Sequence, residues 1–167
     1  GSVKPLLAES WEVSPDLKTV TFKLRKDVKF QNGEPFNAQA VKFSFTRAAG
    51  EKSTNKDKRL FQSMEFIGTP DANTVVIGMK TIEPDLLFLL GQATAIIVEP
   101  KSADTNATQP VGTGPFKLEK YTPKVGASFV RNDGYWGPKV LPDRVEFSFF
   151  ADIPAEVLAL QGDQADI

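Results

Sequence analysis

The segment 7–47 constrains the fold of this 167-residue chain most, because it combines strand, turn and helix signals in one run. Apolar and polar residues alternate over 20–25, which is typical of a half-buried strand. Asn32 and Gly33 favour a turn, since both tolerate positive φ. Asn37 can cap a following helix through its side-chain oxygen. With the elements downstream, this order predicts an α+β fold with mixed, mostly antiparallel sheets and short helices.

Downstream, apolar runs and turn residues predict further strands and helices. Pro84 suits the first turn of a helix that Gly91 can end. A polar connector over 99–109 is the best candidate for a boundary between two packing units. The expected elements are a short helical turn at 59–64, strands at 66–68, 74–79, 95–98, 116–121, 128–131 and 144–150, helices at 86–90 and 153–161, and an extended start at 165–167.

Three aromatic residues and two glycines mark structural positions. We expect Trp11 to lie in the core of the first packing unit, and Tyr135 and Trp136 to pack rather than bind ligand, because such rings bury large areas. Gly112 and Gly114 permit backbone geometry or close approach that a Cβ would block. Their loop lacks the spacing of phosphate-binding loops, so phosphate binding is not expected.

The composition excludes several classes of function. The chain has no Cys and no His, which removes thiol catalysis, histidine catalysis and the common zinc sites. Its formal net charge of -1 gives no case for nucleic acid or an anionic membrane as a partner. No apolar run approaches the roughly 20 residues of a membrane-spanning helix. No spacing of carboxylates or lysines suggests catalysis, so no enzymatic activity, metal or cofactor is expected.

Two signatures resemble one protein family. LAESWEVS at 7–14, FKLRKDVKF at 22–30 and NGEPFNAQAVKFSF at 32–45 resemble the family 5 extracytoplasmic solute-binding proteins, the peptide- and nickel-type receptors of ABC importers. PVGTGPFKLEKY at 110–121, followed by VRN and YWG, resembles the second signature of the same family. Two departures concern helix starts, because no acid follows the Asn37 cap and residues 151–156 read ADIPAE.

The resemblance implies both a domain arrangement and a function. Residues 3–102 resemble the side domain of these receptors, and residues 103–167 resemble part of the large ligand-binding lobe, ending near the hinge. The implied function is capture of a peptide-like or other small solute for an ABC permease. The receptor would be monomeric and periplasmic or otherwise extracytoplasmic, with or without a lipid anchor. The second lobe is not in this chain, so no complete site is expected. A different class stays open, a stand-alone interaction or adhesion module without a transport role.

The resemblance also implies where the side domain reaches the ligand. One segment is the link 91–94, with Gln92, Ala93 and Thr94, and the other lies around Phe61. Nickel-type receptors place a basic residue in the first segment, where this chain has Ala93, which argues against a metal chelate anchored in that way. The alternative is that Gln92 and Thr94 only satisfy backbone groups at a helix end.

Overall fold

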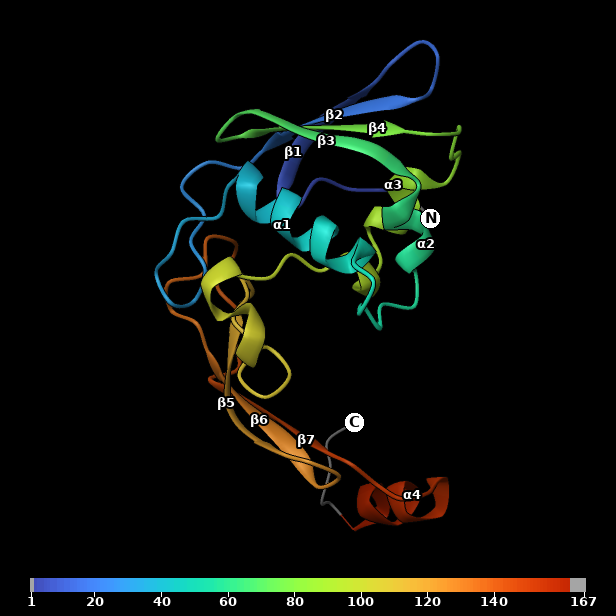
Figure 1. The fold of residues 1–167 in the computed structure, drawn as a ribbon. Helices are drawn as coiled ribbons and strands as arrows, with labels where there is room; N and C mark the ends of the chain where they lie inside the picture. Colours follow the sequence, from blue (N-terminus) through green and yellow to red (C-terminus); the bar gives the residue numbers. More distant parts are fainter. Residues whose placement is uncertain (1, 163–167) are drawn as a thin grey trace. The chain divides into compact units, whose positions relative to one another are not determined.

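The computed structural model describes residues 2–162, and the chain divides into two compact units. Unit 1 ends at Thr113 and unit 2 begins at Gly114 (Figure 1). Each unit has its own sheet and helices, and each is described by itself. The predicted extended segment at 165–167 lies outside the described residues.

Unit 1 is built on a four-stranded antiparallel sheet with the strand order β1-β2-β4-β3. Strands that follow one another in the sequence pair at the two edges, and β2 pairs with β4 in the middle. The strands predicted at 66–68 and 74–79 are confirmed, and they form an antiparallel pair. The strands are β1 (Ala8–Val13), β2 (Thr19–Leu24), β3 (Met64–Asp71) and β4 (Thr74–Met79).

Helix α1 (Ala38–Ala49) lies along one face of this sheet and contacts β3 and β4 (Figure 1). Asn37 caps it as predicted, because its Oδ1 accepts a hydrogen bond from the Ala40 N–H at 3.1 Å. Val41 and Phe45 belong to its buried face. Helix and sheet each bury an apolar face against the other, which forms a two-layer core. The largest fully buried apolar side chains are Ile77, Met79, Val28 and Val75.

The predicted turn at Asn32 and Gly33 is confirmed. Gly33 has a φ of 88°, a left-handed conformation that glycine adopts without a Cβ clash. The Asn32 Oδ1 accepts a hydrogen bond from the Glu34 N–H at 3.2 Å. The Phe30 N–H donates to the Glu34 carbonyl at 2.8 Å, which closes the turn.

The predicted strand at 95–98 is wrong. Ala95 ends a 3-10 helix, and the Val98 N–H donates to the Ser44 Oγ of α1 at 3.0 Å. A side chain that takes up a backbone group removes that group from a possible sheet ladder. This part of unit 1 is instead made of short helical elements, namely α2 (Lys58–Gln62), α3 (Leu86–Leu90), η1 (Ala93–Ala95) and η2 (Pro100–Thr105).

Trp11 does not lie in the core, contrary to the prediction. It is half-buried on β1, an edge strand, where it pairs with Phe22 of β2. An edge strand has a neighbouring strand on one side only, so its side chains receive less cover than those of a central strand. The deeply buried positions of the sheet belong to the central strands, with Val20 on β2 and Val75 and Ile77 on β4.

Unit 2 contains the three-stranded antiparallel sheet β5-β6-β7 and one helix, α4. Phe129 of β6 pairs with Leu118 on one side and Val145 on the other. The Asp152 carboxylate caps α4 by accepting a hydrogen bond from the Ala155 N–H at 2.9 Å, despite the unusual sequence of this helix start. The elements are β5 (Phe116–Thr122), β6 (Gly126–Arg131), β7 (Arg144–Ser148) and α4 (Ile153–Gln161).

Tyr135 and Trp136 lie against each other in unit 2. Both are half-buried, and their ring centroids are 5.1 Å apart. Gly137 leaves room for this arrangement, because a Cβ there would lie 2.6 Å from the Tyr135 ring. The geometry is that of a packing pair, and a purely structural role for it stays a prediction.

Gly112 and Gly114 flank the division between the two units. The Gly112 carbonyl accepts a hydrogen bond from the Gln31 N–H at 2.9 Å in unit 1. The Gly114 carbonyl accepts one from the Asn132 Nδ2 at 3.1 Å in unit 2. The boundary expected from the sequence, after residue 102, falls earlier, inside η2, where Ala103 is buried.

Candidate functional site

Hydrogen bonds in unit 1 join Thr94, in one of the two segments expected to approach a ligand, to the loop before α2, the helix that contains Phe61. The Thr94 Oγ1 donates to the Asp57 Oδ2 at 2.5 Å, and the Asn55 Nδ2 donates to the Thr94 carbonyl at 2.7 Å. These bonds tie η1, which contains Thr94, to the loop that leads into α2. We call residues 55–62 together with residues 91–94 the α2–η1 surface.

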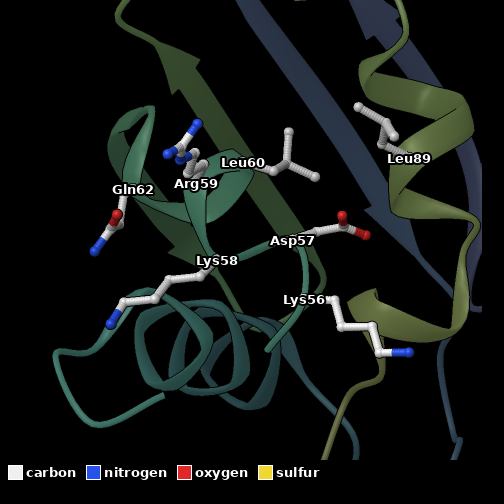
Figure 2. Close-up of a pocket in the computed structure, with 7 residues that line it drawn as sticks. All are labelled: Lys56, Asp57, Lys58, Arg59, Leu60, Gln62 and Leu89. Atoms are coloured by element: carbon white, nitrogen blue, oxygen red, sulfur yellow. The ribbon is translucent and has the colours of Figure 1, made fainter. Parts of the chain in front are cut away.

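A pocket of about 440 Å³ opens at the α2 part of this surface, and neither Phe61 nor any residue of 91–94 is among the residues that line it. Small-ligand pockets usually measure roughly 300–1,000 Å³, so a small solute group fits. Figure 2 shows Lys56 and the Asp57 carboxylate on the side of α2 that faces Leu89 of α3, whereas Lys58 and Gln62 extend on the other side. The lining residues are Lys56, Asp57, Lys58, Arg59, Leu60, Gln62 and Leu89.

Positive charge predominates around this pocket. Lys56, Lys58 and Arg59 stand against one carboxylate, that of Asp57. The Lys58 Nζ donates to the Glu51 carbonyl at 2.6 Å, and the Asp57 carboxylate accepts the bond from η1 described above. Lys56 and Arg59 are exposed, so water screens their attraction for anions. The pocket suits a polar solute group bound with modest strength.

The residues predicted for ligand binding differ in their exposure. Phe61 is 3% exposed, and its ring centroid lies 5.2 Å from that of Phe45, so its side chain supports the surface from within the core. Ala93 and Gln92 are exposed. The Gln92 Nε2 donates to the Phe88 carbonyl at 3.4 Å, which is the backbone-satisfying role that the sequence left open. Ligand contact by these side chains stays a prediction.

Two large apolar side chains near the link were not singled out from the sequence. Phe88 on α3 is 57% exposed and Ile96, directly after η1, is 63% exposed. The available signal was helical periodicity, because a single short helix buries one face, here through Leu86. These side chains give this part of unit 1 an apolar component beside the charged one.

The described residues contain neither a metal centre nor a membrane span. Within residues 2–162, no three or more acidic, His or Cys side chains gather as a metal ion would require. In the same range, no helix has both the length and the apolar character needed to cross a bilayer.

The chain is similar to known solute-binding proteins. The sequence profile of the bacterial extracellular solute-binding proteins, family 5, middle region, matches residues 2–167. A putative ABC transporter peptide-binding protein of Brucella ovis is 34% identical over 95% of this chain and 32% of its own length. The dipeptide-binding protein of Escherichia coli K12 is 32% identical over 99% of this chain and 36% of its own length.

A solved structure extends the similarity to the fold. The structure described as a nickel ABC transporter from Bacillus halodurans is 40% identical, with a TM-score of 0.86 over 97% of this chain and 33% of its own chain. The chain thus spans about a third of the length of the relatives that it matches. The predicted α+β, periplasmic-binding-protein-like fold is confirmed. The chain belongs to the bacterial extracellular solute-binding proteins, family 5.

Proposed function

We propose that this chain is part of an extracytoplasmic receptor that captures a small solute and delivers it to an ABC permease. The observation that carries the proposal is the family match along residues 2–167. Relatives similar to the chain carry names of peptide- and dipeptide-binding proteins of ABC transporters. We infer a periplasmic or surface location, with or without a lipid anchor, and a monomeric receptor without catalytic turnover.

Within this proposal, the chain contributes one side of the ligand site. Residues 3–102 act as the side domain, and residues 103–167 act as part of the large lobe. The α2–η1 surface supplies the contacts of the side domain, with Gln92, Ala93 and Thr94 at its edge and Phe61 behind it. Its support is that the Thr94 bonds hold two separate segments together beside a pocket. Ligand pockets bury about 70–90% of a ligand, so this chain alone should bind the solute weakly.

The names of relatives and the charges of the pocket bear on the class of solute. Named ligands among the relatives and solved neighbours include dipeptides, nickel and agropinic acid, so family membership does not select one. Ala93 carries no charge with which to anchor a metal chelate at the link 91–94, and the exposed cations of the pocket, Lys56 and Arg59, are screened by water. We therefore favour a peptide-like or other polar organic solute over a metal chelate.

The test is recovery of the solute from the protein that the complete gene encodes. Native mass spectrometry of protein purified without denaturation should show a bound small molecule, and calorimetry with that molecule should give saturable binding. A dipeptide such as Ala-Ala and a nickel–histidine complex serve as probes of two named ligand classes. Binding of a macromolecule with no saturable small-molecule binding would favour the stand-alone interaction module instead. Turnover of a peptide or ester that is lost on substitution of one carboxylate would overturn the non-enzymatic reading.

A further inference from the structure

Glu99 is a deeply buried acid in unit 1. The residue is 2% exposed, and its carboxylate accepts three hydrogen bonds. The donors are the Lys101 N–H at 2.8 Å, the Ser102 N–H at 2.9 Å and the Asn32 Nδ2 at 3.0 Å. Burial of a carboxylate is costly unless such bonds compensate for the lost water. Glu99 is therefore held in the ionised state by a set of fixed donors.

These bonds join two segments that are far apart in the sequence. Lys101 and Ser102 belong to η2, whereas Asn32 belongs to the turn after β2. The same turn makes further contacts with the same stretch. The Glu34 Oε1 pairs with the Lys101 Nζ at 2.6 Å, and the Gln31 N–H donates to the Gly112 carbonyl at 2.9 Å. The turn at 31–34 is thus bonded to the segment 99–112 both near its beginning and at its end.

The segment 99–112 is the last stretch of unit 1 before the chain passes into unit 2 at Gly114. Bonds that hold the segment 99–112 in place therefore also hold the C-terminal end of unit 1 in place. The Glu34–Lys101 pair is exposed and contributes little, because water screens such pairs. The buried carboxylate is the stronger tie, since bonds to a charged group out of water are among the strongest hydrogen bonds.

The tie depends on the charge of Glu99. Burial acts to raise the pKa of Glu99, but the hydrogen bonds from Lys101, Ser102 and Asn32 together outweigh it and hold the pKa below the ordinary value of 4.5. The Lys101 ammonium, which pairs with Glu34, also favours the ionised form of Glu99. A lowered pKa gives stability above the ordinary value that is lost as the pH falls through the lowered one.

We propose that the Glu99 carboxylate is a charge-dependent latch that holds the turn at 31–34 on the segment 99–112. While ionised, it accepts all three donors and fixes the exit of the chain from unit 1. Protonation places a hydrogen on one oxygen, which then faces donors and releases at least one of them. The exit segment is loosened in acid while the sheet of unit 1 stays folded.

The test is amide hydrogen exchange on the 167-residue chain, measured near neutral pH and at a series of acidic values. Glu99→Gln should lower the protection of the Lys101 and Ser102 amides by about tenfold or more. It should leave the amides of β4 unchanged. Glu34→Gln is the matched control, because it removes only the exposed ion pair, and protection should change by less than about threefold. In the unsubstituted chain the same amides should lose protection on acidification, and Glu99→Gln should abolish that response.

Two results would overturn the latch. One is unchanged protection of Lys101 and Ser102 in Glu99→Gln, and the other is the same acid response with and without the carboxylate. If Glu99→Gln unfolds unit 1, Asn32→Asp decides, since Asn32 is exposed and an aspartate keeps the oxygen that accepts from the Glu34 N–H while it removes the donor to Glu99. It should speed exchange at 31–34 and 99–102 and spare β4, and uniform or absent changes would contradict the proposal.

Discussion

The two units carry sheets of the same kind but bury their apolar residues to very different extents. Unit 1 buries large side chains from every strand except β1 and from α1, including Ile77 at 1% exposure. Among the described residues of unit 2, Ala159 is the one buried apolar residue. Leu141 is 91% exposed, Leu158 is 67% exposed and Phe147 is 55% exposed.

An antiparallel sheet alone therefore does not form a buried core. Apolar alternation is present on β2 and on β5 to β7, but within residues 2–162 a helix packs over the sheet of unit 1, namely α1, and none packs in the same way over β5 to β7. A sheet needs such a layer to bury its apolar face. Unit 2 instead carries charged pairs around Arg131 and Arg144, and exposed pairs stabilise weakly.

The largest expected effect comes from matched phenylalanine truncations in the two units. Phe45→Ala should destabilise unit 1 by about 3–5 kcal/mol, because the ring is buried against Phe61. Phe147→Ala should cost about 1 kcal/mol or less, because its ring is half exposed and meets the Phe129 ring edge-on rather than lying in a core. Urea unfolding measures both. Equal losses of unfolding free energy in the two variants would contradict the difference in burial between the two units.

Fluorescence can assign each transition to one unit. The chain has two tryptophans, Trp11 in unit 1 and Trp136 in unit 2. Trp136→Phe leaves the signal of unit 1, and Trp11→Phe leaves that of unit 2. The Phe45→Ala shift should appear in the Trp11 signal.

A smaller effect is expected for Trp11→Ala. Trp11 is half-buried on an edge strand, so truncation should cost about 1–2 kcal/mol rather than the about 3–5 kcal/mol of a fully buried ring. The measurement is thermal or urea unfolding followed by far-ultraviolet circular dichroism, with Trp11→Phe as the milder control. A loss as large as that of Phe45→Ala would place the side chain in the core after all.

Removal of the α1 cap should have a similar or smaller effect. Asn37→Ala should destabilise unit 1 by about 1 kcal/mol, because the Ala40 N–H loses its partner. Asn37→Asp should retain the cap and gain a few tenths of a kcal/mol, about 0.3, from a charge at a helix start that has no acid in its first turn. If Asn37→Ala and Asn37→Asp are equally stable, the cap does not hold this end of α1.

The smallest expected effect concerns the pH response of unit 2. A hydrogen bond from the Arg131 guanidinium, 2.9 Å from Asp133, holds the pKa of Asp133 below its ordinary value of 3.8. The pair therefore stabilises unit 2 above that value, and the contribution is lost as the pH falls through the lowered pKa. Arg131→Gln should raise the pKa of Asp133, whereas Arg144→Gln should not. Carbon-13 titration of the carboxyl group measures this, and an identical pKa in all three proteins would contradict the assignment.

The sequence predicted local features well and layer membership poorly. Some features depend only on residues that are close in the sequence, so a short segment is enough to predict them. Examples are the Asn37 cap, the Gly33 turn and the pairing of β3 with β4. The prediction that Trp11 lies in the core is wrong, because burial on an edge strand depends on elements that are distant in the sequence. Local patterns do not show which elements these are. The strand predicted at 95–98 is wrong for the same reason, since the Ser44 Oγ on α1, distant in the sequence, accepts the hydrogen bond of the Val98 N–H.

The candidate site divides in the same way. Resemblance brought forward the link at 91–94 and the region around Phe61, and the hydrogen bonds of Thr94 join the first of these to the loop before α2. Asn55, Asp57 and the basic residues of the pocket were not singled out, because the polar loop that carries them has no pattern of its own. The structure shows that Asn55 and Asp57 of this loop bond to Thr94 of η1.

The most direct test of the proposed function compares two exposed alanines in the protein that the complete gene encodes. Ala93→Glu places a charged side chain on the α2–η1 surface, and Ala107→Glu places the same side chain in an exposed loop after η2. Calorimetry with the solute recovered from the native protein measures both. The account predicts that Ala93→Glu raises the Kd by about tenfold or more, which is about 1.4 kcal/mol, while Ala107→Glu binds normally. Unchanged affinity in Ala93→Glu would contradict a ligand site at the α2–η1 surface.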